Sequence, residues 1–183
     1  VKPYQPADLW KAITYDTKST QEYVLSTGDG LYRRGFYTYW KRQVPPPSML
    51  QLDAPTRETC TLRRQRTNTP LQALALLNDT QFVEAARVLA QRVLSSAPPS
   101  DRAGITATFR RAVAREPSDS ESQSLLRLLS AERIRFQQDR AAAEALLSVG
   151  ESSVPAEMNR SEMAAWTVLA NVLLNLDEAL SRE

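Results

Sequence analysis

Three arginines within four residues, Arg63, Arg64 and Arg66, stand directly before a helix start that the sequence predicts at Thr69-Pro70. The first amide hydrogens of a helix have no partner inside it, and they lie at the positive end of the helix dipole. Guanidinium groups beside such an end can bind carboxylate, phosphate or sulfate through paired hydrogen bonds. The pattern therefore predicts an anion-binding site, whose candidate residues are Arg33, Arg34, Arg57, Arg63, Arg64, Arg66 and Asn68.

A structural interpretation of the same arginines competes with this one, and we favour it. Arginine suits ion pairs in partly buried places. The cluster would then pair with Asp53, Glu58 and the acidic C-terminal helices, and would hold the basic segment against the rest of the fold. Anion binding stays open as the alternative.

Aromatic side chains are interleaved with basic ones from Tyr32 to Arg42. The hypothesis of a stacking surface for bases or sugars has three candidates, Tyr37, Tyr39 and Trp40. Such a run also packs extended segments onto helices, with the tyrosine hydroxyls at the edge, and we favour that interpretation.

Composition excludes several kinds of catalysis. The chain has no histidine and a single cysteine, Cys60. It therefore contains no Ser-His-Asp or Cys-His nucleophile system, no imidazole ligand for zinc or haem, and no internal disulfide. No loop has the spacing of an EF-hand calcium site. We expect no catalytic residue, metal or cofactor in this chain, and we interpret Cys60 as a small buried side chain.

The charge is distributed unevenly. The net charge is +2, but residues 31–66 hold eight Lys and Arg against two acidic residues, a local net of +6. A basic segment of this size could face an anionic ligand. Because the whole chain is only weakly basic, we do not expect nucleic acid as a partner. No run approaches the ~20 apolar residues of a membrane-spanning helix, so no span is predicted.

These candidates must be positioned by two different parts of the chain. Residues 1–56 read as a basic, aromatic and proline-rich arm with one short helix near "PADLWKAIT". The period-two pattern of residues 31–42 predicts a strand or extended segment, and the three prolines after it predict polyproline-like backbone.

Residues 57–183 read as a helical bundle. One predicted helix starts with the capping box Thr69–Gln72, is broken at Asn78-Asp79-Thr80 and runs to about residue 95, with Leu71, Leu74 and Ala85 on its apolar face. Further helices are predicted over about 101–115, 119–147 and 156–181, the second starting from a capping box at Ser118 and carrying Ile134 in its apolar stripe. The fold class is mainly α: an irregular bundle of about five to six helices with an extended arm.

The stretch "LYRRGFYTYWKRQVPPPSMLQLDAPTRETCTLRRQRTNTPLQALALLND" resembles the signature of a domain of unknown function. That domain closes large proteins found chiefly in planctomycetes, alongside a c-type cytochrome module and a second uncharacterised domain. The opening "VKPYQPADLW" and the ending "WTVLANVLLNLDEALSRE" also match. The chain departs from the pattern at Gly35, where the family is expected to carry a serine or a similar residue.

The resemblance implies a fragment: the C-terminal part of the domain, from an exported, multidomain protein that works outside the cytoplasm. It implies other domains of the same polypeptide as partners, including the cytochrome module, whose haem site is not in this chain. It assigns no catalytic residue. Two functions follow as hypotheses: a non-catalytic helical module whose basic arm docks onto neighbouring domains, or a domain that binds anions or acidic or sulfated polysaccharide. In the second case, catalytic groups would lie outside this chain.

Overall fold

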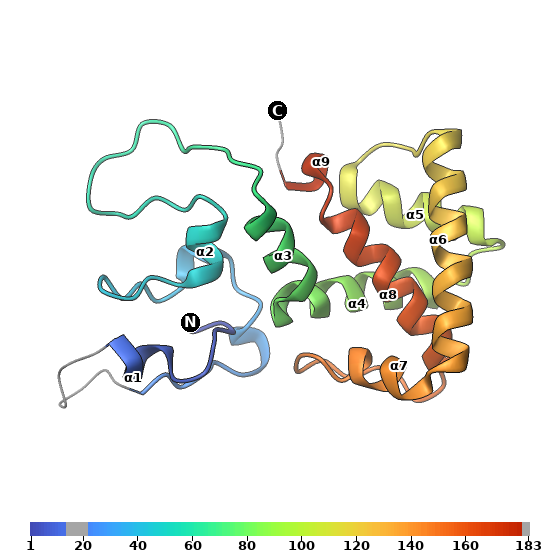
Figure 1. Cartoon of the computed structure of the whole chain (residues 1–183), viewed down its shortest axis with the longest axis horizontal. Coiled ribbons are helices and arrows are strands. Elements are labelled where there is room, and N and C mark those ends of the chain that lie inside the picture. Colours follow the sequence, from blue (N-terminus) through green and yellow to red (C-terminus); the bar gives the residue numbers. More distant parts are fainter. Residues whose placement is uncertain (14–21, 181–183) are drawn as a thin grey trace. The chain divides into compact units, whose positions relative to one another are not determined.

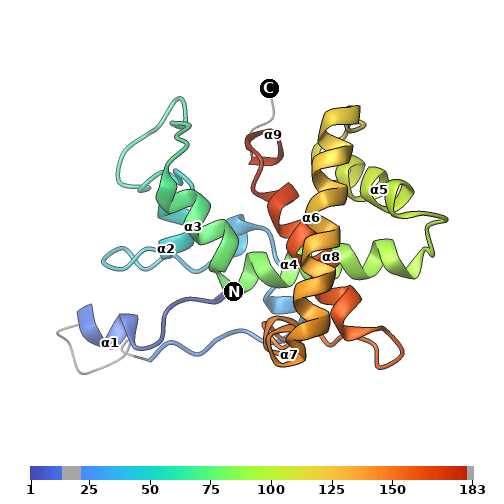
Figure 2. The ribbon, with the colours of Figure 1, turned by 45° about the vertical axis from the view of Figure 1, so that its right-hand side comes forward.

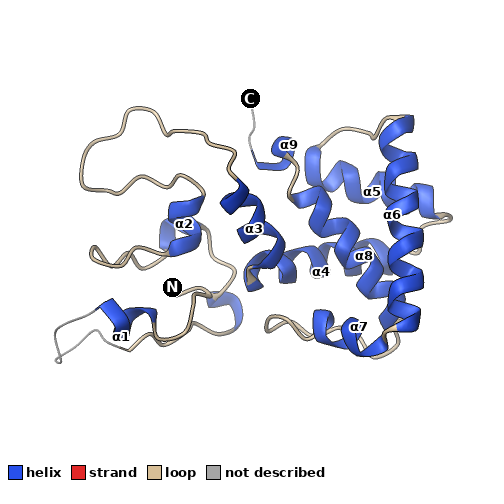
Figure 3. Cartoon of the chain, in the orientation of Figure 1, coloured by secondary structure: helices blue, strands red, loops and turns tan. Residues whose placement is uncertain are grey.

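The computed structural model describes residues 1–13 and 22–180, and within these residues it is helical with no strand (Figure 3). Nine α-helices form in that part of the chain, six of them eight residues or longer, which confirms the mainly α class. In order they are α1 Leu9–Ile13, α2 Pro47–Gln51, α3 Pro70–Asn78, α4 Thr80–Ser95, α5 Asp101–Val113, α6 Asp119–Gln138, α7 Arg140–Leu147, α8 Arg160–Leu174 and α9 Asp177–Leu180 (Figure 1). Two 3₁₀ turns, η1 Gly28–Gly30 and η2 Gly35–Tyr37, precede α2.

The chain divides into two compact units, Val1–Ala75 and Leu76–Glu183. We call them the first and the second unit and describe each by itself. The predicted division into an arm, residues 1–56, and a bundle, residues 57–183, stays a prediction about folding units.

The first unit is built around Trp10, which is 3% exposed. The ring of Tyr23 meets it edge-on at 4.9 Å, and the Lys41 Nζ lies 4.4 Å from the centre of its ring. The N-terminal segment is fixed beside this group, because the Ser26 amide donates to the Lys2 carbonyl (2.9 Å). Burial raises the pKa of the Tyr23 hydroxyl to about 12.

The strand predicted over residues 31–42 is wrong. The middle of that segment is the 3₁₀ turn η2, in which the Thr38 amide donates to the Gly35 carbonyl (3.1 Å), and the only bridge among the described residues pairs Lys41 with Val44. Alternation alone cannot make a strand when no second strand is available to pair with it. Gly35 also permits a close approach, since a Cβ there would lie 2.7 Å from the Met49 Cε. The polyproline prediction holds only in part, because Pro47 begins α2.

Helix α8 is the centre of the second unit, and it packs against α4, α5, α6 and α7. Figures 1 and 2 show α6 running across the directions of α4 and α5. The core that results is formed by apolar side chains from each of these helices. Its fully buried members include Ala86, Ile105, Leu129, Met163, Trp166 and Leu169.

Short polar side chains start helices α4 to α8 of this unit. The break at residues 78–80 is confirmed: Asp79 accepts from the Gln81 amide (2.9 Å) and starts α4. The Ser118 capping box at the start of α6 is confirmed as well. The single helix predicted over 119–147 is wrong, because Asp139 ends α6 and caps α7 by accepting from the Ala142 amide (2.8 Å).

The final predicted helix, residues 156–181, is also shorter than expected. It begins after the cap Asn159, ends at Leu174, and is followed by the separate turn α9. One residue in each of two predicted apolar stripes, on α4 and on α6, does not face the core. Ile134 is 57% exposed, and Ala85 is exposed while Val83 and Ala86 face the core.

A buried ion pair ties a loop to α4. Glu84 and Arg87 are 2% and 0% exposed, and their closest atoms are 3.5 Å apart. Arg87 also donates to the Val149 carbonyl (3.1 Å) and the Ser152 hydroxyl (2.8 Å), while Glu84 accepts from the Ser152 amide (2.6 Å). These bonds fix residues 149–152 against α4.

Candidate functional site

The segment ahead of α3 is held by the carboxylate of Asp53. It accepts from the Thr67 amide and hydroxyl (both 2.8 Å) and from the Gln72 side-chain amide (3.2 Å). Gln72 accepts from the Thr69 amide (2.8 Å), while the Thr69 hydroxyl accepts from the Gln72 amide (3.2 Å), which confirms the predicted capping box. The bonds from Thr67 lower the pKa of Asp53, with Gln72 and the charge of Arg64 contributing.

Arg64 closes the same loop. Its Nε donates to the Asp53 carbonyl (2.8 Å), and its Nη2 donates to the Leu52 carbonyl. These carbonyls lie at the end of α2, where helical carbonyls lack partners and a cation is favoured. The middle arginine of the "RRQR" run therefore bonds to backbone carbonyls, and the pairing of the cluster with Asp53, Glu58 and the acidic C-terminal helices stays a prediction.

The other predicted anion ligands lie along two exposed stretches. Arg33 and Arg34 precede η2, while Arg63, Arg66 and Asn68 lie on the loop before α3, and all are exposed. The guanidinium groups of Arg33, Arg34 and Arg63 make no hydrogen bond or ion pair with the described residues, although the Arg34 carbonyl accepts from the Tyr37 amide (2.9 Å). The seven-residue anion site stays a prediction.

Arg57 meets one of the predicted aromatic residues instead. Its guanidinium carbon lies 4.5 Å from the centre of the Trp40 ring, a cation–π contact. Arg57 has φ 65°, in the left-handed region that non-glycine residues adopt at a cost. The two sequence hypotheses, anionic and aromatic, thus come together at one pair of residues, Trp40 and Arg57.

A cleft of about 340 Å³ lies beside this pair, lined by Trp40, Arg42, Thr56, Arg57 and Glu58. On its wall Arg42 binds Glu58 through two parallel bonds, Nε to Oε1 at 2.7 Å and Nη2 to Oε2. This pairing lowers the pKa of Glu58 and raises that of Arg42. Arg42 and Glu58 therefore carry no net charge together. Among the residues that line the cleft, Arg57 has the one charge that no opposite charge of the lining balances.

The sequence did not identify Arg42, Thr56 and Glu58 as cleft residues. Arg42 and Glu58 are sixteen residues apart, and no periodicity connects such positions. The remaining aromatic candidates, Tyr37 and Tyr39, are 58% and 48% exposed, and the Tyr39 ring lies 5.8 Å from that of the buried Trp10. Cys60 is exposed, which corrects its interpretation as a buried side chain.

Helix α3 turns Leu71 and Leu74 outward and Gln72 inward, while its Leu76 is buried. Leu71 and Leu74 are 63% and 58% exposed, whereas Gln72 is 5% exposed. This corrects the prediction that the two leucines belong to a buried apolar face. The hydrogen bonds of Gln72 to Asp53 and Thr67 explain the orientation, since they fix the opposite side of the helix toward the loop.

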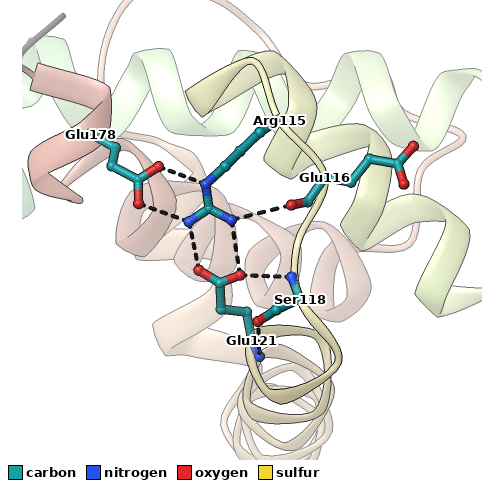
Figure 4. Close-up of polar contacts among 5 residues, drawn as sticks. All are labelled: Arg115, Glu116, Ser118, Glu121 and Glu178. Atoms are coloured by element: carbon teal, nitrogen blue, oxygen red, sulfur yellow. Dashed lines mark hydrogen bonds and ion pairs between the residues drawn. The ribbon is translucent and has the colours of Figure 1, made fainter. Parts of the chain in front are cut away.

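Arginine clamps in the second unit were missed by sequence reasoning. Arg115 binds Glu178 and Glu121 with four bonds of 2.7–3.0 Å and donates to the Glu116 carbonyl (3.2 Å), so it joins the end of α5 to α6 and α9 (Figure 4). Arg133 does the same for the first turns of α5 and α8, binding Asp101 (2.5 Å) and Glu162 (2.5 Å). Both clamps are structural.

Within residues 1–13 and 22–180, no three potential ligands among His, Cys, Asp and Glu gather as a metal site. No helix in the same residues is long and apolar enough to cross a membrane.

Fold and site together define a mainly α-helical module with a basic, partly apolar surface on its first unit. The family model that matches residues 1–129 is PSD1, described as a protein of unknown function (DUF1553). The match covers more than half of the 183 residues, and the chain belongs to this family. The resemblance to a domain of unknown function is thereby confirmed, whereas the planctomycete source and the cytochrome companion stay predictions. No curated protein matches the chain, and no solved structure does.

Proposed function

We propose that the chain is a non-catalytic helical module that docks onto other domains of its own polypeptide through the first unit. The observation that carries the proposal is the orientation of α3, with Leu71 and Leu74 in solvent and Gln72 inside. Fully burying a leucine contributes about 1.5–3 kcal/mol. A fold that leaves two neighbouring leucines outside forgoes that gain, and a partner surface would recover it.

Charge supports a particular kind of partner surface. The first unit carries eleven Lys and Arg against six Asp and Glu, a net of +5. Further apolar side chains are exposed on it, with Phe36 at 85% and Leu62 at 100%. Apolar patches between basic residues favour a partner that offers an apolar surface flanked by carboxylates.

The location and the partner extend this proposal. We place the module outside the cytoplasm, beside a c-type cytochrome module of the same polypeptide. Both statements rest on the family resemblance, and the exposed basic surface of the first unit is compatible with them.

The test compares amide hydrogen exchange of the chain alone with that of the whole polypeptide. Docking should slow exchange in α3 and in the loop 55–69, and the double variant Leu71→Ser/Leu74→Ser should abolish the difference. The matched control is Ile134→Ser, which removes an equally exposed apolar side chain from α6, 57% exposed. Equal exchange of α3 in both preparations would overturn the proposal.

A second function, the binding of an anion or of acidic or sulfated polysaccharide, is favoured by one observation. Arg57 lies against Trp40 at the mouth of a cleft and forms no hydrogen bond or ion pair with the described residues. Titration of the chain with acidic and sulfated oligosaccharides, followed by calorimetry, tests it. The expected result is saturable binding that neutral oligosaccharides do not show.

A further inference from the structure

We propose that the cleft of Trp40, Arg42, Thr56, Arg57 and Glu58 is a binding site for a uronic acid residue, that is, a sugar ring that carries a carboxylate. The inference rests on the second function above and assigns its ligand class and its central residue. Arg57 binds the carboxylate, and Trp40 both positions Arg57 and contacts the ring.

The position of the Arg57 guanidinium suits the binding of a planar oxyanion such as a carboxylate. Its guanidinium lies over the indole of Trp40, 4.5 Å from the ring centre, and none of its N–H groups bonds to a described residue. A guanidinium held on an aromatic face keeps its N–H donors available at its edge, where two of them match the two oxygens of a carboxylate. The indole thus orients the donors before the ligand arrives, which reduces the ordering that binding requires.

The charge of the cleft fits a single negative charge. Arg42 and Glu58 already satisfy each other through two parallel bonds, so the lining carries two arginines against one carboxylate, a net of +1. One uronate carboxylate neutralises that charge, whereas a phosphate dianion would leave an excess. The carboxylate of Glu58 also repels ligands that carry more than one negative charge.

The size and the remaining lining fit one sugar ring. A volume of about 340 Å³ lies near the lower end of the range for small-molecule sites, ~300–1,000 Å³. Trp40 is half-buried, so part of its indole is open to a ring, and Thr56 supplies a hydroxyl that can bond to a sugar hydroxyl.

The experiment titrates the chain with methyl glucuronide and with a galacturonate trimer. Binding is followed by calorimetry and by the shift of the Trp40 indole N–H signal in ¹⁵N-edited spectra. Neutral methyl glucoside, glucose 6-sulfate and a glutamate-rich peptide are the comparison ligands. Arg57→Gln should weaken uronate binding by roughly tenfold or more, because it removes a charge-assisted paired bond. Arg92→Gln, a change at an exposed arginine of α4 outside the cleft and outside the predicted anion site, should leave it unchanged.

Each outcome decides the proposal. Uronate binding that shifts the Trp40 signal and is lost in Arg57→Gln, but kept in Arg92→Gln, supports it. Equal binding in both variants overturns this site while the second function stands, and the absence of binding to every anionic saccharide overturns both. Binding of glucose 6-sulfate or the acidic peptide as strong as that of the uronates overturns the assignment to uronic acids. Because Arg57 is exposed, an unchanged melting temperature is expected for its variant and verifies that it is folded.

Discussion

Gly150 is the position where a single methyl group should damage the second unit most directly. A Cβ there would lie 2.4 Å from Cδ of Glu84 and 2.6 Å from its Oε2, and the backbone has φ 88°. An L-residue held at such a φ costs about 1–3 kcal/mol. Glu84 is 2% exposed, so its carboxylate can yield only by giving up its bonds to Arg87 and Ser152.

Breaking a buried pair costs about 3–5 kcal/mol, and a small shift of the loop recovers part of that. We therefore expect Gly150→Ala to lower the free energy of unfolding by about 4 kcal/mol. For a protein of this size each kcal/mol shifts the melting temperature by about 2–4 °C, so the transition should fall by roughly 8–16 °C.

Thermal and urea unfolding followed by circular dichroism measure the effect. The double variant Glu84→Ala/Arg87→Met removes the obstructing carboxylate and its partner, and adding Gly150→Ala in that background should cost only the backbone strain. Gly28→Ala is a second control, because φ is 54° there but nothing lies within 4 Å of the added Cβ. A cost for Gly150→Ala that is equal in both backgrounds, or no larger than that of Gly28→Ala, would refute the reasoning.

Three more predictions concern packing, pH and the loop before α3. Gly104→Ala should destabilise the second unit by about 1–3 kcal/mol in urea unfolding, because its Cβ would lie 2.5 Å from Cη2 of Trp166. The bonds from Arg115 and the Ser118 cap lower the pKa of Glu121 from 4.5 to about 2. This carboxylate stabilises the fold above pH 4.5, and the contribution should disappear as the pH falls to about 2. Asp53→Asn should accelerate amide exchange over residues 55–69, because it weakens the bonds that Thr67 makes to the carboxylate. Asparagine adopts the left-handed backbone of this position (φ 58°) readily, so the backbone itself should not be strained.

The outcomes that contradict these predictions are equally specific. Unfolding of Gly104→Ala at the wild-type urea concentration would mean that the Trp166 ring moves aside without cost. An Arg115→Gln variant with an unaltered pH profile between 4.5 and 2 would show that the clamp does not set the titration of Glu121. Unchanged exchange in Asp53→Asn would mean that the Thr67 bonds do not hold the loop.

Local signals in the sequence predicted the helix starts well. The capping boxes at Thr69 and Ser118 and the cap at Asp79 involve partners two or three residues away, so their chemistry is visible in a short window. Periodicity also predicted the helices themselves. It did not show which side of α3 would be covered, because that depends on Asp53, nineteen residues from Gln72.

Long-range pairings account for the rest of what the sequence did not reveal. The contact between Trp40 and Arg57 and the bond between Arg115 and Glu178, 63 residues apart, have no periodic signature. The anion-site hypothesis grouped arginines by their proximity in sequence. The structure instead places Arg64 on the carbonyls after α2 and Arg57 on an indole, so neighbours in the chain have different surroundings.

The central place of α8 has a consequence for biosynthesis. Nine of its fifteen residues are buried, and it is made after the helices that surround it. At ~5–20 residues per second, the ~80 residues between the end of α4 and the end of α8 take roughly 4–16 s to synthesise. During that interval the apolar faces of α4 to α7 emerge from the ribosome without their common partner, so the core of the second unit is completed only after α8 has been made.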